Sequence, residues 1–448
     1  MAGATATAEG PAPTGRKDMP QPTQNRALSA LVAPQRVQNM IQVRSQYIQW
    51  PGPGTRRGVS LSNMRFVTVI LMVTMAYAQN NQPAKATFED QPALLLANGT
   101  LELTVLPTGS TFASVVLADD PEKLSPLWNP LRMAREAGEK NVFDSAQGHF
   151  ICVDGFGPVS KEEEAAGLPG HGEAHQSPFE VKYYNKDGRI TTLTLETKLP
   201  LTQERFARTV RMVDGENVIY VESELESLLA FDRPVFWAEH ATIGSPFLEA
   251  GVTVVDMSVR RAKTRPYSES ELEGGLPHRL VSDKEFTWPE APGLHTPKID
   301  VRAAPKEPNS GDHTTCLMDP SRKLVFVTAL HPGKRLVLGY LFKPQEYPWT
   351  QNWEYYPKNK KMARGMEFST QPFDVPRREV VQLNSMFEAP VYRWLPARTK
   401  IGSRFLMFYA RTPEGFHKVD DVRFENGKII VEDRKAHKQV TLAASLPI

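Results

Sequence analysis

Cysteine is scarce in this chain, and its scarcity excludes two classes of protein. The 448 residues include two cysteines, Cys152 and Cys316. A small disulfide scaffold needs several cysteine pairs, and a zinc knuckle needs a Cys-x-x-Cys motif, which the chain lacks. One disulfide between the two residues and two separate core thiols are both compatible with the sequence. We expect two separate thiols.

The chain also lacks a strong excess of either charge. It carries 53 Lys and Arg against 51 Asp and Glu, a formal net charge of +2. Residues 1–63 hold seven basic and two acidic side chains, so the remainder of the chain carries a formal charge of −3. A mildly acidic body lacks the basic footprint of proteins that bind nucleic acids. We therefore expect no nucleic-acid partner.

The apolar run at residues 66–78 is too short for a membrane span, which needs about 20 residues. It follows Met64-Arg65 and ends in Ala-Tyr-Ala, and this order is typical of a secretory signal peptide. We interpret residues 64–78 as a signal peptide, with Met64 as the start. Residues 1–63 are rich in Pro, Ala, Gln and Arg, and would be disordered or a mis-assigned extension. The mature protein would then be exported, periplasmic or secreted. The alternative is a cytosolic tail ahead of a buried strand.

Helical periodicity is almost absent, whereas two-residue alternation recurs along the chain. We predict a solvated loop at residues 161–166 and a long surface excursion, anchored by Trp288, at residues 259–306. Residues 88–412 show no shift in composition and predict one large antiparallel, all-β sandwich. Residues 413–448 predict an appended β-hairpin packed on an edge. Alternating runs separated by turns rich in Gly, Asn or Asp predict hairpins at residues 179–195, 206–225, 324–342 and 422–432.

Three short motifs contain residue types suited to proton transfer. His171 lies in Pro-Gly-His-Gly, His240 follows an apolar run and precedes a Gly-Ser-Pro turn, and Glu367 lies in a second apolar run. Burial of a glutamate raises its pKa and makes it a stronger base. Each motif also has a plainer interpretation. His171 fits an ordinary turn, His240 fits a lone histidine at a strand end, and Glu367 fits an exposed ion pair with Arg364 or Arg377.

Taken together, the motifs resemble a known family. In order and rough separation, Pro-Gly-His171-Gly, Glu-His240-Ala-Thr-Ile-Gly and Gly-Met-Glu367-Phe-Ser-Thr-Gln-Pro resemble the three acid/base motifs of aldose 1-epimerases (galactose mutarotases). The resemblance spans roughly residues 90–412, and the sequence is most similar to a divergent branch of the aldose 1-epimerase superfamily. It implies a galactose mutarotase-like β-supersandwich with a sugar cleft. Glu367 would take the proton of the anomeric hydroxyl, His240 would protonate the ring oxygen, and His171 would polarise that oxygen. It implies no metal and no organic cofactor.

The residues that would recognise the sugar match the family less well. The second motif continues as Ala241-Thr-Ile-Gly-Ser-Pro, where mutarotases have an aromatic pair and an asparagine. We assign substrate binding to His175, Trp353 and Arg132, which lie close to the motifs or beside the opening strands in sequence. Asp312 is an available carboxylate between the second and third motifs. The expected partner is a small-molecule sugar or sugar derivative.

The sequence therefore favours an aldose 1-epimerase-like enzyme that interconverts sugar anomers by acid–base ring opening. The alternative is a non-catalytic carbohydrate-binding protein on the same scaffold. The altered sugar-recognition motifs favour this alternative. Polysaccharide lyases and glycoside hydrolases are a third class. Canonical hydrolysis needs two opposed carboxylates, and the obvious pair is Glu239 and Glu367. Because Glu239 adjoins His240 on a strand, it should point to the opposite face of the sheet.

Overall fold

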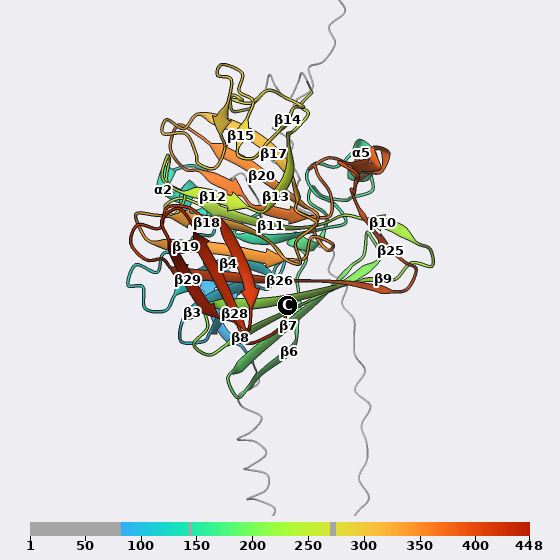
Figure 1. Ribbon diagram of the computed structural model, residues 1–448. Coiled ribbons are helices and arrows are strands. Elements are labelled where there is room, and N and C mark those ends of the chain that lie inside the picture. The colour runs from blue at the N-terminus through green and yellow to red at the C-terminus, as the bar shows by residue number, and fades with distance from the viewer. Residues whose placement is uncertain (1–81, 142, 144–145, 269–274) are drawn as a thin grey trace, which may run out of the picture. The chain divides into compact units, whose positions relative to one another are not determined.

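The computed structural model describes residues 82–141, 143, 146–268 and 275–448, all within one compact unit of the chain (Figure 1). Residues 1–63 and the signal-like segment 64–78 lie outside the described residues. None of the described helices is long and apolar enough to cross a membrane.

Two large antiparallel sheets dominate the described residues, and together they form the all-β sandwich that the sequence predicts. The larger sheet contains twelve described strands. Its order is β1 (Ala84–Phe88), β2 (Gln91–Ala97), β3 (Leu101–Leu106), β4 (Thr111–Leu117), β5 (His149–Val153), β11 (Trp237–Gly244), β21 (Ala363–Gly365), β20 (Trp349–Tyr356), β17 (Ser310–Met318), β13 (Val259–Thr264) and β14 (Glu285–Phe286), with β22 (Glu367–Ser369) pairing with β11 and β20.

The second sheet contains eight described strands and includes three of the predicted hairpins. Its order is β12 (Val254–Met257), β18 (Val325–His331), β19 (Leu336–Phe342), β26 (Lys400–Arg411), β9 (Val218–Ser227), β8 (Glu204–Val213), β7 (Ile190–Leu199) and β6 (Glu180–Asp187). Alternate residues of β7 and β8 are buried, as two-residue periodicity requires of a sheet with one face on a core. Buried residues from both sheets share one hydrophobic cluster, which includes Leu193, Val210, Ile151 and Trp237.

Strand β11 lies in the interior of the larger sheet, between β5 on one side and β21 and β22 on the other. All eight of its residues are buried. Successive side chains on a strand point to opposite faces, so Glu239 and His240 enter different environments. Glu239 contacts Arg208 of the eight-stranded sheet, whereas His240 faces away from that sheet.

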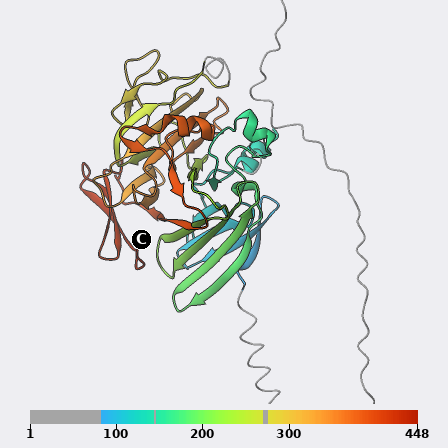
Figure 2. The ribbon, with the colours of Figure 1, turned by 90° about the vertical axis from the view of Figure 1, so that its right-hand side faces the viewer.

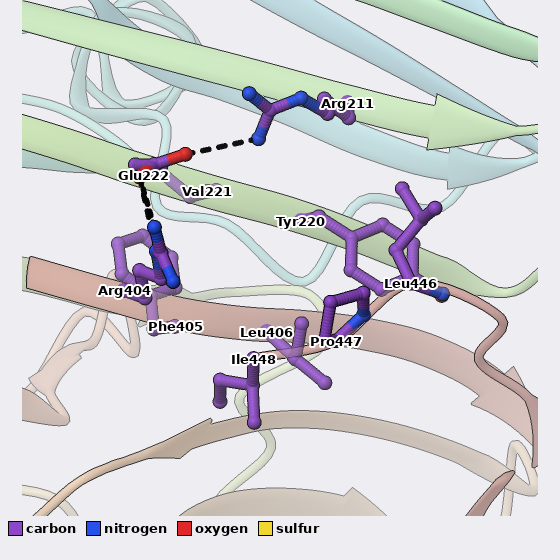
Figure 3. Close-up of a pocket in the computed structure, with 10 residues that line it drawn as sticks. All are labelled: Arg211, Tyr220, Val221, Glu222, Arg404, Phe405, Leu406, Leu446, Pro447 and Ile448. Atoms are coloured by element: carbon purple, nitrogen blue, oxygen red, sulfur yellow. Dashed lines mark hydrogen bonds and ion pairs between the residues drawn. The ribbon is translucent and has the colours of Figure 1, made fainter. Parts of the chain in front are cut away.

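The C-terminal extension is larger than predicted and packs differently. The predicted hairpin forms as β27 (Asp421–Glu425) and β28 (Lys428–Asp433), but β29 (Lys438–Ala443) adds a third strand. This small sheet covers a face of the eight-stranded sheet, not an edge (Figure 2, dark red), because its apolar side chains cluster with those of β18, β19 and β26. The prediction of an edge-packed hairpin was therefore wrong. The last residues, Leu446–Ile448, then lie beside Tyr220 and Leu406 (Figure 3).

The described helices are short, which explains why helical periodicity was hard to detect. Residues 161–166, predicted to be a loop, contain helix α3 (Lys161–Ala165) with a capping box between Ser160 and Glu163. The other two α-helices are α2 (Pro130–Ala137), capped by the side chain of Asn129, and α5 (Arg377–Leu383), and η1 (Ala174–Gln176) is a 3₁₀ helix. Five to eight residues span at most about two turns, too few for a periodic pattern to emerge.

The predicted surface excursion at residues 259–306 is only partly correct. It begins with β13, which pairs with β17 inside the larger sheet. Trp288 packs against the core, as expected of an anchor. The remaining small pairs of the described chain are β15 (Glu290–Ala291) with β16 (Ile299–Asp300), β10 (Arg233–Val235) with β25 (Arg393–Leu395), and β23 (Ser385–Met386) with β24 (Ala389–Pro390).

Candidate active site

A cavity of about 230 Å³ lies over the face of the larger sheet that carries His240. Side chains from β5, β11, β22, β20 and β17 reach it, together with residues from loops. Aromatic residues form one part of its wall and titratable residues the other. The aromatic residues are Trp128, Phe143, Phe150, Phe156 and Trp353, and the titratable residues are His171, His240, His313, Glu367 and Asp374.

Strand register brings the second and third motifs together. Phe150 of β5 pairs with His240 of β11, and their rings stack with centroids 4.1 Å apart. On the other side of β11, Glu239 pairs with Phe368 of β22, so the next residues along, His240 and Glu367, lie side by side. The Nε2 atom of His240 and the Oε1 atom of Glu367 are 3.1 Å apart. Residues 127 positions apart in the sequence thus form a buried acid/base pair.

Burial decides the charge state of this pair. It raises the pKa of Glu367 well above its ordinary range, and the nearby Asp374 adds to that rise. Burial lowers the pKa of His240, and the nearby His171 lowers it further. Both shifts favour a protonated carboxyl and a neutral imidazole at neutral pH. The Nδ1 atom of His240 lies 2.9 Å from the hydroxyl oxygen of Thr242, so Nε2 is the nitrogen that faces Glu367.

His171 reaches the cavity from a strained loop. Its φ is 65°, in the left-handed region that a residue with a side chain rarely adopts. Gly172 follows with φ 76°, and a Cβ there would lie 2.0 Å from the carbonyl oxygen of Val153, so glycine is required. The Nδ1 atom of His171 accepts the backbone N–H of Gly157 at 3.3 Å, and this leaves Nε2 as the protonated nitrogen of the neutral ring. Burial lowers the pKa of His171 to about 4, so the ring stays neutral at neutral pH.

The thiol of Cys152 also lies near His171, with Sγ 3.4 Å from Nδ1. A Cys–His contact is one signature of nucleophilic catalysis, which needs a thiolate. Burial raises the pKa of Cys152 well above its ordinary range, and the charge of Glu367 adds to the rise. The thiol therefore stays protonated and acts as a small core residue. Cys152 and Cys316 are both free and buried, in agreement with the expectation of separate thiols.

Two cavity residues were not predicted from the sequence. Asp374 lies seven residues after Glu367, beyond the end of β22, and His313 lies on β17. The Nδ1 atom of His313 is 3.1 Å from Oδ1 of Asp374, and Nε of Arg265 donates to the same oxygen at 2.6 Å. Burial alone would raise the pKa of Asp374, but His313 and Arg265 outweigh it and hold that pKa below its usual range. No local pattern links these residues, because three separate segments supply them.

Known proteins are similar to this chain in structure but not detectably in sequence. No family model matches the sequence, and no curated protein matches it. Similar solved structures include a protein from Synechocystis (11% identity, TM-score 0.49, covering 74% of this chain and 96% of that one). They also include a galactose mutarotase-like protein from Clostridium acetobutylicum (12% identity, TM-score 0.49, covering 74% of this chain and 99% of that one). Another is a galactose mutarotase-like protein from Lactobacillus casei (13% identity, TM-score 0.46, covering 71% of this chain and 100% of that one). These are partial likenesses in structure at low sequence identity.

The cavity takes in four of the six predicted site residues. Glu367, His240, His171 and Trp353 line it, whereas His175 and Arg132 do not. His175 is buried behind the wall, with its ring 5.7 Å from that of Phe150. It lies on the short 3₁₀ helix at Ala174–Gln176, and its ring centroid is 6.0 Å from that of His171.

Arg132 and Asp312 are engaged elsewhere. Arg132 lies on α2, and its Nη2 donates to the carbonyl oxygen of Ser245 at 2.7 Å. Asp312 accepts from Nε of Arg279 at 2.7 Å. Neither His175 nor Arg132 therefore lines this cavity, and their substrate-binding roles stay predictions. In the described part of the chain, no group of three or more His, Cys, Asp or Glu side chains is placed to hold a metal ion.

Glu239 points away from the cavity, as its position next to His240 predicts. Both of its carboxylate oxygens accept from Nη2 of Arg208, at 2.6 and 2.7 Å, and Nε2 of His149 lies 2.9 Å away. Glu239 and Glu367 therefore lie on opposite faces of the sheet and cannot flank one glycosidic bond. This pair does not provide the two opposed carboxylates of a glycoside hydrolase.

A second cavity, of about 240 Å³, is a poorer candidate for chemistry (Figure 3). It lies on the outward face of β8, β9 and β26, beside the last residues of the chain. Its charged residues are Arg211, Glu222 and Arg404, which pair with one another across the strands. Burial alone would raise the pKa of Glu222, but Arg404 and Arg211 outweigh it and lower that pKa, while Glu222 raises the pKa of Arg404. Both groups therefore stay charged at neutral pH and are poorly suited to proton transfer.

Replacing Gly365 with alanine tests whether the position of Glu367 matters. A Cβ at residue 365 would lie 2.1 Å from Oε1 of Glu367, so the carboxyl group must swing away from His240. For the reaction proposed in the next subsection, we expect turnover to fall by about 10²-fold, since misplacement of a reacting group by 1 Å has effects of this size. The NMR assay described there measures turnover, and urea unfolding measures stability. Gly402→Ala is the matched control, because its nearest neighbour would be 3.6 Å away. Wild-type turnover in Gly365→Ala would show that the Glu367–His240 contact is not needed.

Proposed function

We propose that this protein is an aldose 1-epimerase-like enzyme that interconverts the anomers of a small sugar by acid–base ring opening. The observation that carries the proposal is the buried Glu367–His240 pair, with Nε2 and Oε1 3.1 Å apart at the wall of a cavity. Ring opening needs one group that removes a proton and one that donates a proton. A carboxyl and an imidazole whose pKa values burial has shifted towards each other can exchange these roles.

The proposed reaction starts with a proton shift inside the pair. Oε1 of Glu367 lies 3.1 Å from Nε2 of His240 without an aligned hydrogen bond, so the two groups first rotate into line. The carboxyl proton of Glu367 then moves to Nε2 of His240, which leaves a carboxylate and an imidazolium. The carboxylate then takes the proton of the anomeric hydroxyl while the imidazolium protonates the ring oxygen. The bond between the anomeric carbon and the ring oxygen breaks, and the anomeric C–O bond becomes a carbonyl. Rotation of the open chain and the reverse transfers give the other anomer, with no net change in protons.

His171 and the aromatic wall support the same reading of the cavity. The protonated Nε2 of His171 is a neutral donor that can hold the ring oxygen without taking its proton. Trp353 offers an apolar ring face beside His240, with ring centroids 6.4 Å apart. A volume of about 230 Å³ lies below the range of about 300–1,000 Å³ typical of drug-sized ligands. One sugar ring suits this space better than an oligosaccharide.

The direct test is anomer exchange by the wild-type protein. Saturation-transfer NMR on hexoses, pentoses and uronic acids would compare exchange with and without protein. We expect at least one sugar to show an exchange rate that rises in proportion to protein concentration. A rate equal to the buffer background across the whole panel would rule out the epimerase proposal.

A non-catalytic carbohydrate-binding protein is the second candidate. The observation that favours it is that Arg132 and His175, two of the expected substrate ligands, lie outside the cavity wall. Sugar binding that survives both Glu367→Gln and His240→Asn, with no turnover by the wild type, would support binding without catalysis.

We also propose that the protein is exported and that Met64 is its start. This rests on the sequence pattern of residues 64–78 alone. Mass spectrometry of the natural protein checks it. A mature N-terminus shortly after Ala78 is expected, whereas a peptide from residues 1–63 would contradict the proposal.

A further inference from the structure

We propose that His313, oriented by Asp374, accepts a hydrogen bond from a sugar hydroxyl that lies away from the anomeric carbon. This inference rests on the assignment of the cavity to a sugar and adds a specificity-determining residue to it. The ligand class is a polyhydroxylated ring, and the contact is to a hydroxyl that stays intact during ring opening.

The first support is that His313 is a buried residue of the cavity wall. It lies on β17 opposite Trp353 of β20, and its side chain is only 4% exposed. Nδ1 is 3.1 Å from Oδ1 of Asp374, whereas Nε2 is buried and has no hydrogen-bond partner among the described residues. Because His313 lines the cavity, Nε2 is the atom available to a ligand. An unpartnered buried polar atom is rare and calls for an explanation.

The second support is the direction of the hydrogen bond. Asp374 is held by Arg265, whose Nε donates to Oδ1 at 2.6 Å, so it is ionised at neutral pH and can only accept. The proton between His313 and Asp374 must therefore sit on Nδ1. With its single proton on Nδ1, an uncharged imidazole presents the lone pair of Nε2, and we infer that this lone pair accepts a hydroxyl proton. His171 has the opposite arrangement, since its Nδ1 accepts from the backbone and its Nε2 donates.

The third support is the distance between the two parts of the cavity. Glu367 lies on β22, which pairs with β20, and β20 pairs with β17. Two strand spacings of about 4.8 Å separate the axes of β22 and β17 by roughly 10 Å. His313 therefore contacts a part of the sugar other than the anomeric carbon, which reacts beside Glu367. At this distance His313 can bind a sugar hydroxyl, whereas Glu367 and His240 carry out the acid/base steps.

The test measures binding and turnover separately. The probes for binding are 1,5-anhydro-D-glucitol, 1,5-anhydro-D-galactitol and 1,5-anhydro-D-xylitol, which keep the ring and lack the anomeric hydroxyl. Isothermal titration would compare wild type with His313→Asn. His331→Asn is the matched control, because His331 is also buried, with Nε2 2.9 Å from Oε2 of Glu249, and lies outside the cavity. Turnover of the sugars that exchange would give kcat and KM for the same three proteins.

We expect His313→Asn to weaken binding of the best anhydro-alditol by at least about 10-fold and to raise KM similarly, since a lost hydrogen bond to a buried group has effects of this size. kcat should change less than about 3-fold, and His331→Asn should match wild type. Asp374→Asn leaves His313 in place and should also weaken binding. This second variant serves as the test if His313→Asn does not fold. Removing the contacted hydroxyl from the sugar should weaken binding to wild type and not to His313→Asn.

The outcomes separate this inference from the proposed reaction. Binding that depends on His313, without turnover by wild type, supports the inference and contradicts the epimerase proposal. Equal binding by His313→Asn and His331→Asn overturns the inference, even if turnover is present. A fall in kcat at unchanged KM overturns it too, because His313 would then act in the chemistry. Failure of wild type to bind any of the three probes overturns it as well.

Discussion

Replacing Glu367 with glutamine is expected to reduce catalysed anomer exchange by about 10²- to 10⁴-fold, the range that general acid–base groups contribute. Glutamine keeps the size of the side chain and its contact with His240, but it has no proton to release and no carboxylate with which to take one. Saturation-transfer NMR on whichever sugar the wild type turns over measures the change. The loss should appear in kcat and not in KM, because the substitution preserves the shape of the cavity.

The same variant should be at least as stable as wild type, and increasingly so as the pH rises. Burial raises the pKa of Glu367 in the folded state above its ordinary value of 4.5. Above that value the unfolded chain releases the proton while the folded protein keeps it. Stability therefore falls with rising pH, by up to about 1.4 kcal/mol per pH unit, until the folded pKa is reached. Glutamine removes this dependence, so the melting temperature of Glu367→Gln should exceed that of wild type most clearly at alkaline pH.

Glu249→Gln is the control for both measurements. Glu249 also pairs with a histidine, His331, but its side chain is 54% exposed and lies outside the cavity. We expect wild-type turnover and nearly wild-type stability from it. Turnover by Glu367→Gln within a few-fold of wild type would exclude Glu367 as the base. A large drop in its stability would contradict the protonated state inferred for the folded protein.

Replacing Arg208 with methionine is expected to destabilise the protein by about 3–5 kcal/mol, the effect of removing one partner of a buried ion pair. Both side chains of the Arg208–Glu239 pair are fully buried. Without Arg208, the carboxylate of Glu239 keeps neighbours such as His149 and Tyr347 but loses its cation. Urea unfolding measures the free energy. The double variant Arg208→Met/Glu239→Gln should recover part of the loss, because it also removes the unpaired charge.

Arg205→Met is the matched control, because it lies on the same strand, β8, and pairs with Glu226 at 2.8 Å on the outward face. Its side chain is 35% exposed, so we expect a change of about 0–1 kcal/mol. Equal effects of the two substitutions would contradict the view that the Arg208–Glu239 pair is a buried network. A selective effect of Arg208→Met would show that the strand carrying His240 depends on the charge behind it.

Much of the fold was predictable because strand patterns are local. Four predicted hairpins form where alternating residues flank a turn. The opposite directions of Glu239 and His240 follow from adjacency on a strand and needed no structure. The short helices were missed, because five to eight residues give too few turns for a helical period to emerge. The third strand of the C-terminal sheet was also missed.

The sequence by itself determined the all-β class and three candidate acid/base residues, because each lies in a short recognisable motif. Only the tertiary structure decided that Glu367 meets His240, since this contact depends on the pairing of β11 with β22. It also decided that Asp374 and His313 complete the cavity and that His175 and Arg132 do not line it. A cavity wall is assembled from segments far apart in the chain, and whether a side chain reaches it depends on register and loop direction, which no local pattern records.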